Sequence, residues 1–173
     1  MRIVIAHGAS GNAASMRPHV DGLRERGVDA VAIDLPLRKA EAAVEAYREA
    51  AGLVAPDAPA SIIGVQSYGG RVASLLAAAG PPAVRGLVLM SYPLHRPGEP
   101  DWDVRSAHWP SIEVPVLLLS GEADPFARLD LLRMAVTERL PHAELVTYPR
   151  LGHTLKPVLG DALDRIAAFV TRL

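Results

Sequence analysis

Residues 61–73 read Ser61-Ile62-Ile63-Gly64-Val65-Gln66-Ser67-Tyr68-Gly69-Gly70-Arg71-Val72-Ala73. An apolar run ends abruptly at Ser67, and glycines and an alanine-rich stretch follow it. This pattern predicts a strand, a sharp turn and a helix, with the serine in a tight backbone conformation at the turn. The serine then has two interpretations: a hydroxyl lifted clear of the sheet, or the N-cap of the following helix.

The glycines around Ser67 match only part of the usual pattern for such a turn. Gly69 stands two residues after the serine, but two residues before it the chain has Val65 where glycine is usual. We expect Gly64, one step earlier, to relieve the crowding, and the later glycines to let strand and helix pack closely. The rest of the chain has to decide between the two interpretations.

Strand and helix patterns alternate along the chain. Short apolar runs predict strands at 2–6, 28–33, 61–65, 86–90, 114–119 and 144–148, and helical patterns occupy 13–26, 38–53, 68–79, 126–140 and 158–173. Residues 91–112 are rich in Pro, His and Trp without periodicity, which is typical of a functional loop. The alternation predicts an α/β fold: a six-stranded, mainly parallel sheet with helices on both faces. At 173 residues we expect a single domain, 1–173, without a lid domain.

Composition narrows the function classes. The formal net charge is -1 and the basic residues form no stripe, which argues against nucleic acid and anionic membranes as partners. There is no cysteine, so a thiol nucleophile and a zinc-thiolate site are excluded. No signal-peptide core or membrane span is evident, and we expect a cytoplasmic protein. Small-molecule or protein partners are left.

The residues that follow the predicted strands carry chemistry. In an open parallel sheet, ligands bind outside the carboxyl ends of the strands. His7 follows the first strand, Ser67 the third, Asp124 the fifth and His153 the sixth. A serine, an acid and a histidine therefore occur in the order Ser, Asp, His at one sheet edge.

That order resembles the α/β-hydrolase fold over essentially the whole chain. Four strings resemble, more narrowly, the dienelactone-hydrolase-related branch that includes testis-expressed protein 30 and the hydrolase-like domain of an NSL-complex subunit. They are Gly69-Gly70-Arg71, Ser91-Tyr92-Pro93-Leu94-His95-Arg96-Pro97-Gly98, Gly121 with Asp124-Pro125-Phe126, and Gly152-His153 with Lys156-Pro157. The resemblance implies that Ser67 is a nucleophile, His153 its general base and then acid, and Asp124 the carboxylate that orients the imidazole. Gln66 stands where these relatives usually have a basic residue.

The implied chemistry requires further groups around the serine. A tetrahedral oxyanion needs donors, and we expect the backbone N–H groups of Ala9 and Tyr68 to supply them. The candidates for the walls of a shallow, open substrate pocket are Tyr68, Tyr92, Leu94 and Trp109. The first hypothesis is a serine hydrolase that cleaves a small ester or thioester through an acyl-enzyme, without cofactor or metal. Transfer of the acyl group to an acceptor other than water needs the same residues.

Other interpretations stay open for single residues. Asp124 before Pro125 is also a good helix N-cap, and Glu122 is a rival acid on the same loop. His7 is more typical of a residue that holds its loop by hydrogen bonds. His95, His108, Trp102 and Trp109 are interpreted as a hydrophobic plug or a pocket wall. The histidines and acids lack metal-ligand spacing. The rival function is a hydrolase-like scaffold that binds a protein partner with little or no turnover.

Overall fold

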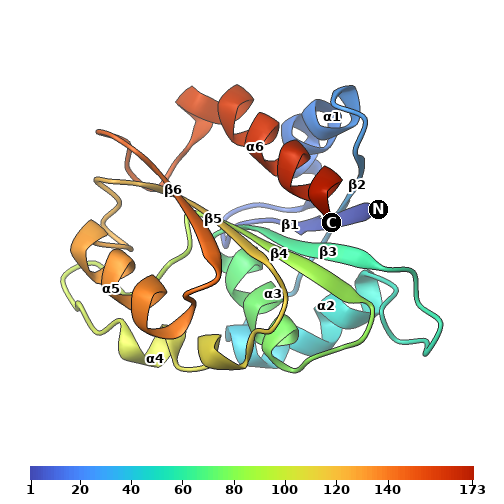
Figure 1. Ribbon diagram of the computed structural model, residues 1–173, viewed down its shortest axis with the longest axis horizontal. Helices are drawn as coiled ribbons and strands as arrows, with labels where there is room; N and C mark the ends of the chain where they lie inside the picture. Colours follow the sequence, from blue (N-terminus) through green and yellow to red (C-terminus); the bar gives the residue numbers. More distant parts are fainter.

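The computed structural model describes residues 1–173 and places six strands in one sheet between two layers of helices (Figure 1). The strands are β1 (Arg2–Ala6), β2 (Asp29–Ile33), β3 (Ser61–Gln66), β4 (Val84–Met90), β5 (Val116–Gly121) and β6 (Ala143–Tyr148). Their order is β2-β1-β3-β4-β5-β6, and every neighbouring pair is parallel. The predicted α/β architecture is confirmed.

The helices join consecutive strands and cover both faces. They are α1 (Arg17–Glu25), α2 (Val44–Ala50), α3 (Tyr68–Ala78), α4 (Asp103–Ser106), α5 (Leu129–Arg139) and α6 (Leu159–Arg172), with short 3-10 turns at Ala13–Met16, Ala40–Ala43, Trp109–Ser111 and Lys156–Val158. In Figure 1, α1 and α6 lie on one side of the sheet, and α2, α3 and α5 on the other. No lid domain covers the sheet edge, as expected.

Each face of the sheet has its own hydrophobic core. Strand residues point alternately to the two sides, so Ile3 packs with Leu23 and Ile166 of α1 and α6, whereas the next residue, Val4, packs with α2 and α3. The central strands are covered on both sides, and every residue of β5 is buried. This is why these strands are continuous apolar runs rather than alternating ones.

The structure departs from several predicted element bounds, and the helix expected at 13–26 is a 3-10 turn followed by α1. The helix expected at 38–53 becomes a 3-10 turn followed by α2, and the one expected at 126–140 starts only at Leu129. Residues 91–112 are not a plain loop, because they contain α4 and a 3-10 turn and their first five residues are buried. The start of that segment and Trp109 therefore pack into the core, while residues 96–101 lie on the surface.

Both ends of the chain lie at the amino edge of the sheet. Met1 immediately precedes β1, and the side chain of Leu173 packs at Gly86, in β4, where an added Cβ would lie 2.7 Å from it. In the register of the sheet, Gly86 pairs with Ile62 of β3, and Ile62 pairs with Ile3 of β1. The loops that carry Ser67, Asp124 and His153 are at the opposite, carboxyl edge.

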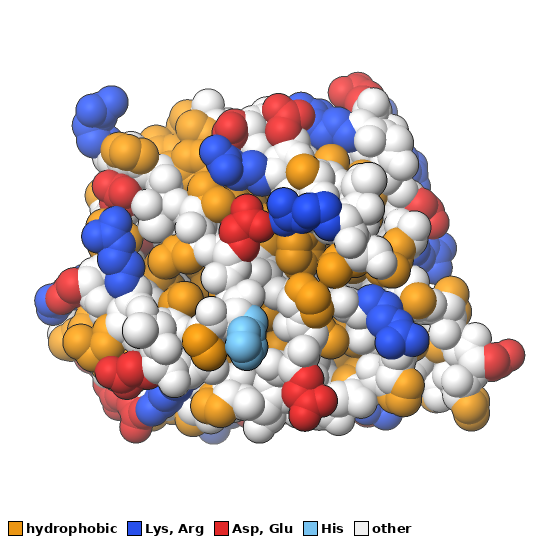
Figure 2. Space-filling model, viewed as in Figure 1, with side chains coloured by type: hydrophobic (Ala, Val, Ile, Leu, Met, Phe, Trp, Pro, Cys, Tyr) orange, Lys and Arg blue, Asp and Glu red, His pale blue; other side chains and the backbone are white.

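The surface shows no dominant charge on the face seen in Figure 2, where acidic and basic side chains are interspersed among apolar ones. The helices are all too short or too polar to cross a lipid bilayer.

Candidate active site

Ser67 occupies a strained turn between β3 and α3. Its backbone angles are φ 46° and ψ -111°, in a region that residues with a side chain rarely adopt. Although Ser67 is the N-cap residue of α3, its side chain makes no capping hydrogen bond. The hydroxyl is therefore not used to cap the helix, and the turn directs it elsewhere.

Gly69 shows why small residues follow the serine. A Cβ at this position would lie 2.7 Å from Ala6 of β1, closer than real contacts allow, and the Gly69 N–H donates to the His7 carbonyl at 3.0 Å. The first turn of α3 thus rests directly on the end of β1. This close approach sets Ser67 beside the loop that follows β1, where a Cβ at Gly8 would lie 3.7 Å from the Ser67 Cβ.

The end of β3, just before the serine, is irregular, and a buried tyrosine forms hydrogen bonds with the backbone there. Gly64 has φ 139° and Val65 φ 104°, which is unusual for a β-branched residue. The Tyr47 hydroxyl of α2 inserts between β1 and β3, donating to the Val4 carbonyl at 2.8 Å and accepting from the Gly64 N–H at 2.9 Å. Burial raises the pKa of Tyr47, so the hydroxyl keeps its proton for this bridge. The positive φ of Gly64 and Val65 is thereby held without leaving backbone groups unpaired.

Ser67, His153 and Asp124 form one hydrogen-bonded chain. The Ser67 Oγ lies 2.9 Å from His153 Nε2, and His153 Nδ1 lies 2.8 Å from Asp124 Oδ2. The carboxylate accepts a hydrogen bond from the Nδ1–H. This leaves the unprotonated Nε2 as the acceptor for the serine hydroxyl. Asp124 is buried, whereas the His153 side chain is 28% exposed, so the chain runs from the interior to an accessible edge. The Phe126 ring packs against the imidazole at 4.5 Å between centroids.

The interpretation of Asp124 as a helix N-cap is wrong, because α5 begins at Leu129 and its N-cap residue is Arg128. Asp124 contacts His153 through one carboxylate oxygen. Its second oxygen, Oδ1, accepts the Phe126 N–H at 2.8 Å and so shapes the turn before α5. The rival acid, Glu122, instead accepts a hydrogen bond from Thr147 Oγ1 of β6 at 2.8 Å. Asp124, and not Glu122, is therefore the acid in contact with His153.

Ala9 and Tyr68 line a cavity of about 250 Å³ that also contains Ser67. Neither backbone N–H donates to a protein acceptor. The two predicted oxyanion donors are thus unpaired and adjacent to the serine. The Tyr68 side chain is fixed from the other end, since its hydroxyl donates to the Pro36 carbonyl at 2.7 Å.

The predicted substrate walls Tyr92, Leu94 and Trp109 are not at the cavity surface. All three side chains are fully buried in the core on the α3 side, where the Tyr92 and Trp109 rings pack with centroids 5.1 Å apart. The Tyr92 hydroxyl donates to the Arg105 carbonyl at 2.6 Å, and burial raises the pKa of Tyr92. These residues support the loop under the site, and their assignment as walls is corrected.

Four basic residues that the sequence analysis did not place there line the cavity beside Ser67. Its lining consists of Ala9, Arg38, Lys39, Ala40, Ser67, Tyr68, Arg71, Pro93 and Arg105. Arg38 and Lys39 follow β2 at the same carboxyl edge as the serine, so the edge rule could have found them. Arg105 is on α4, in the segment whose sequence shows no periodicity, and no sequence signal points to it.

The buried histidines of two neighbouring loops serve as backbone braces. His7 Nδ1 donates to the Gly8 carbonyl at 2.8 Å, while its Nε2 accepts the Leu35 N–H at 3.0 Å. His95 repeats this arrangement with the Arg96 carbonyl and the Arg128 N–H. The interpretation of His7 as a residue that holds its loop is confirmed. No three His, Asp or Glu side chains converge in a way that could hold a metal ion.

Comparison with known proteins agrees with this geometry. The family model described as an alpha/beta hydrolase domain matches residues 1–170. The chain belongs to this family. No curated protein matches the sequence. The narrower branch named by the sequence resemblance is not tested by these comparisons and stays a prediction.

Several solved structures share the fold. A monoacylglycerol lipase from Paleococcus ferrophilus superposes with a TM-score of 0.81 at 14% identity, covering 96% of this chain and 92% of that one. A dienelactone hydrolase from Anabaena variabilis gives 0.72 at 19% identity, covering 99% and 86%. The esterase domain of a Rhodothermus marinus protein gives 0.73 at 17%, covering 99% and 86%. At these identities the likeness establishes the α/β-hydrolase fold.

Proposed function

We propose that this protein is a serine hydrolase that cleaves a small ester or thioester through an acyl-enzyme. The observation that carries the proposal is the hydrogen-bonded chain from Ser67 through His153 to the buried Asp124, at a strained turn that opens on a cavity. The hydrolase names of the similar structures agree with it.

In the first half of the reaction the Ser67 Oγ attacks the substrate carbonyl carbon while its proton passes to His153 Nε2. Asp124 stabilises the imidazolium that forms, because its negatively charged carboxylate accepts the hydrogen bond of the Nδ1–H. The N–H groups of Ala9 and Tyr68 donate to the oxyanion. The carbon–oxygen or carbon–sulfur bond to the leaving group then breaks, and His153 returns its proton to that group.

In the second half, water attacks the acyl-enzyme. His153 Nε2 takes a proton from the water as its oxygen bonds to the carbonyl carbon, and a second tetrahedral oxyanion forms against the same donors. When this intermediate collapses, the bond to Ser67 Oγ breaks and His153 protonates the serine. The free acid leaves and the resting state is restored.

The test is the intact mass of the protein after brief exposure to a fluorophosphonate probe. We expect a single adduct on the wild type and none on Ser67→Ala or His153→Ala, because the probe reports a serine activated by a base. Unchanged melting temperatures in the two variants serve as the folding control. An unlabelled, well-folded wild type would overturn the proposal and direct attention to a protein partner.

A further inference from the structure

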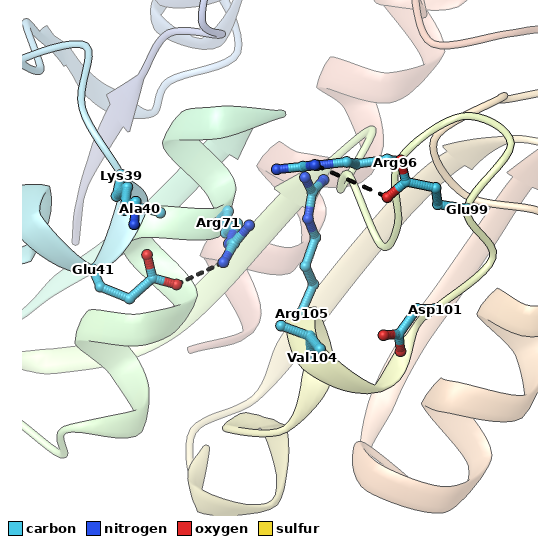
Figure 3. Close-up of a pocket in the computed structure, with 9 residues that line it drawn as sticks. All are labelled: Lys39, Ala40, Glu41, Arg71, Arg96, Glu99, Asp101, Val104 and Arg105. Atoms are coloured by element: carbon cyan, nitrogen blue, oxygen red, sulfur yellow. Dashed lines mark hydrogen bonds and ion pairs between the residues drawn. The ribbon is translucent and has the colours of Figure 1, made fainter.

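The cavity that contains Ser67 continues into a second one with the same basic residues at its boundary. The second cavity, of about 340 Å³, shares Lys39, Ala40, Arg71 and Arg105 with the first. Figure 3 shows Arg71 and Arg105 extending toward this space from different elements, with Arg96 beside the Arg105 guanidinium. The second cavity also contains the carboxylates of Glu41, Glu99 and Asp101, whereas the charged side chains of the first cavity, beside Ser67, are all basic.

The charges around the first cavity are not balanced. Arg38, Lys39, Arg71 and Arg105 line it, and no carboxylate does. Arg71 has an ion-pair partner outside it, Glu41, at 2.6 Å. The other three form no ion pair with any acid of the protein.

Arg105 is held in place by the protein, not left as a free surface side chain. Its Nη1 donates to the Pro93 carbonyl at 2.9 Å. Partial burial and the nearby Arg71 charge lower the pKa of Arg105, which is the cost of placing guanidinium groups together away from water. In addition, the buried Nε of Arg71 has no hydrogen-bond partner. An anion in the cavity would relieve the repulsion and supply an acceptor.

The other large cavity at this edge gives a contrast. It has a volume of about 400 Å³ and reaches the serine turn at Gly8 and Gln66. Lys156 is its only permanently charged lining residue. The gathering of cations is therefore specific to one side of the nucleophile, and is not a general property of the sheet edge.

We propose that the cavity lined by Arg38, Lys39, Arg71 and Arg105 binds an anionic group of the substrate, a carboxylate or a phosphate, while Ser67 attacks the ester or thioester carbonyl. Guanidinium groups suit this role because their planar donors match carboxylate and phosphate oxygens. The inference rests on the proposed hydrolase function and names its substrate class: acyl compounds that carry a second, negatively charged group.

Turnover of two chromogenic esters with the same acyl carbon count tests the proposal. Mono-4-nitrophenyl glutarate carries a terminal carboxylate, and 4-nitrophenyl pentanoate does not. We expect kcat/KM of the wild type to be at least about tenfold higher for the glutarate ester, the size of effect of one charge-assisted hydrogen bond. The preference should shrink when the salt concentration is raised from 0.05 to 0.5 M. Equal kcat/KM values for the two esters would overturn the proposal.

Variants localise the effect. Arg105→Gln should lower the ratio of kcat/KM between the two esters by about tenfold, and Arg105→Lys should restore part of it because it keeps the charge but not the fork of donors. Arg17→Gln is the matched control, since it makes the same change at a side chain on α1 that is 84% exposed. The control should keep the wild-type ratio. A ratio that Arg105→Gln leaves unchanged in a folded protein would contradict the assignment.

Binding to Ser67→Ala separates this inference from the proposed function. Calorimetric titration with glutarate and, separately, with inorganic phosphate should show binding that Arg105→Gln weakens about tenfold, and the tighter of the two identifies the preferred anion. Anion binding without fluorophosphonate labelling of the wild type would refute the hydrolase and keep the anion site. Labelling and turnover without anion binding or preference would refute the anion site and keep the hydrolase.

Discussion

Two serine–histidine pairs lie against the same helix, and they differ in what their hydrogen bonds can do. Ser67 stands at the start of α3 with its Oγ 2.9 Å from His153 Nε2, and Ser74, about two turns later, has its Oγ 2.8 Å from His108 Nε2. The contacts are nearly equal in length. Distance alone therefore does not distinguish a reactive serine from a structural one.

In each pair, a second hydrogen-bond partner determines whether the serine or the histidine donates the proton in the hydrogen bond between them. Asp124 accepts a hydrogen bond from the Nδ1–H of His153, so Nε2 accepts one from the Ser67 hydroxyl. Ser74 instead donates its single proton to the Arg71 carbonyl at 2.8 Å, so the His108 Nε2–H must donate to the serine. No carboxylate contacts the His108 ring, and Ser74 is fully buried. In the first pair the serine hydroxyl donates to the histidine, as the proposed mechanism requires, and in the second pair the histidine donates to a buried serine.

Removing each serine hydroxyl is the strongest test of the difference between the two pairs. Ser67→Ala should abolish ester turnover, by on the order of 10⁴- to 10⁶-fold in kcat as in other serine hydrolases, with an unchanged melting temperature. Ser74→Ala should keep turnover and the fluorophosphonate adduct, because its hydroxyl is not exposed to substrate. Steady-state kinetics and intact mass measure both. Loss of labelling in a folded Ser74→Ala would show that the comparison is wrong.

Replacing the orienting acid tests the direction of the proton. Asp124→Asn should lower kcat by on the order of 10⁴-fold, because the amide no longer fixes the tautomer in which Nε2 accepts from Ser67. Glu122→Gln is the matched control on the same loop and should stay close to wild type, since Glu122 is bonded to Thr147. Kinetics of the two variants side by side decide the matter. Full activity in Asp124→Asn would remove Asp124 from the proposed mechanism.

The strained backbone that precedes Ser67 depends on Tyr47. Tyr47→Phe removes the hydroxyl that bridges Val4 and Gly64, leaving two buried backbone groups without a partner. At about 1–3 kcal/mol for each such group, the free energy of unfolding should fall by about 2–6 kcal/mol. Urea unfolding measures this loss. A variant as stable as wild type would mean that the irregular end of β3 needs no bridge.

The smallest expected effect concerns His108. Burial, with a contribution from Arg71, lowers the pKa of His108 from 6.5 to about 4. The unfolded chain then binds a proton between those values and the folded one does not, so stability falls as pH drops from 6.5 toward 4. Because His108 is only partly buried, we expect wild type to lose about 1–2 kcal/mol more than His108→Gln between pH 7 and pH 5. Urea unfolding at both values measures the difference, and equal losses would contradict it.

The sequence was sufficient for the sheet because its signal is local. Apolar runs and the glycines and prolines between them placed all six strands, and the rule that parallel strands end at one edge brought Ser67, Asp124 and His153 together. The choice between Asp124 and Glu122, in contrast, required the structure. Both acids lie on one loop, and only the direction of their side chains distinguishes them.

The residues that line the cavity could not be predicted from the sequence, and the reason is physical. Residues 91–112 have no period, so nothing in the pattern tells which side of Tyr92, Leu94 or Trp109 faces the core. The basic cavity is assembled from three separate parts of the chain: the adjacent residues Arg38 and Lys39, Arg71, and Arg105. Their meeting depends on how α3 and α4 pack, and that is a property of the tertiary fold.

The placement of the two chain ends has a practical consequence. Met1 and Leu173 lie at the amino edge of the sheet, and the strands separate that edge from the loops around Ser67. An affinity tag, a fluorescent protein or a solid support joined to either end would therefore be held on the far side from the cavity. The protein can be immobilised from either end with the edge that carries Ser67 facing the solution.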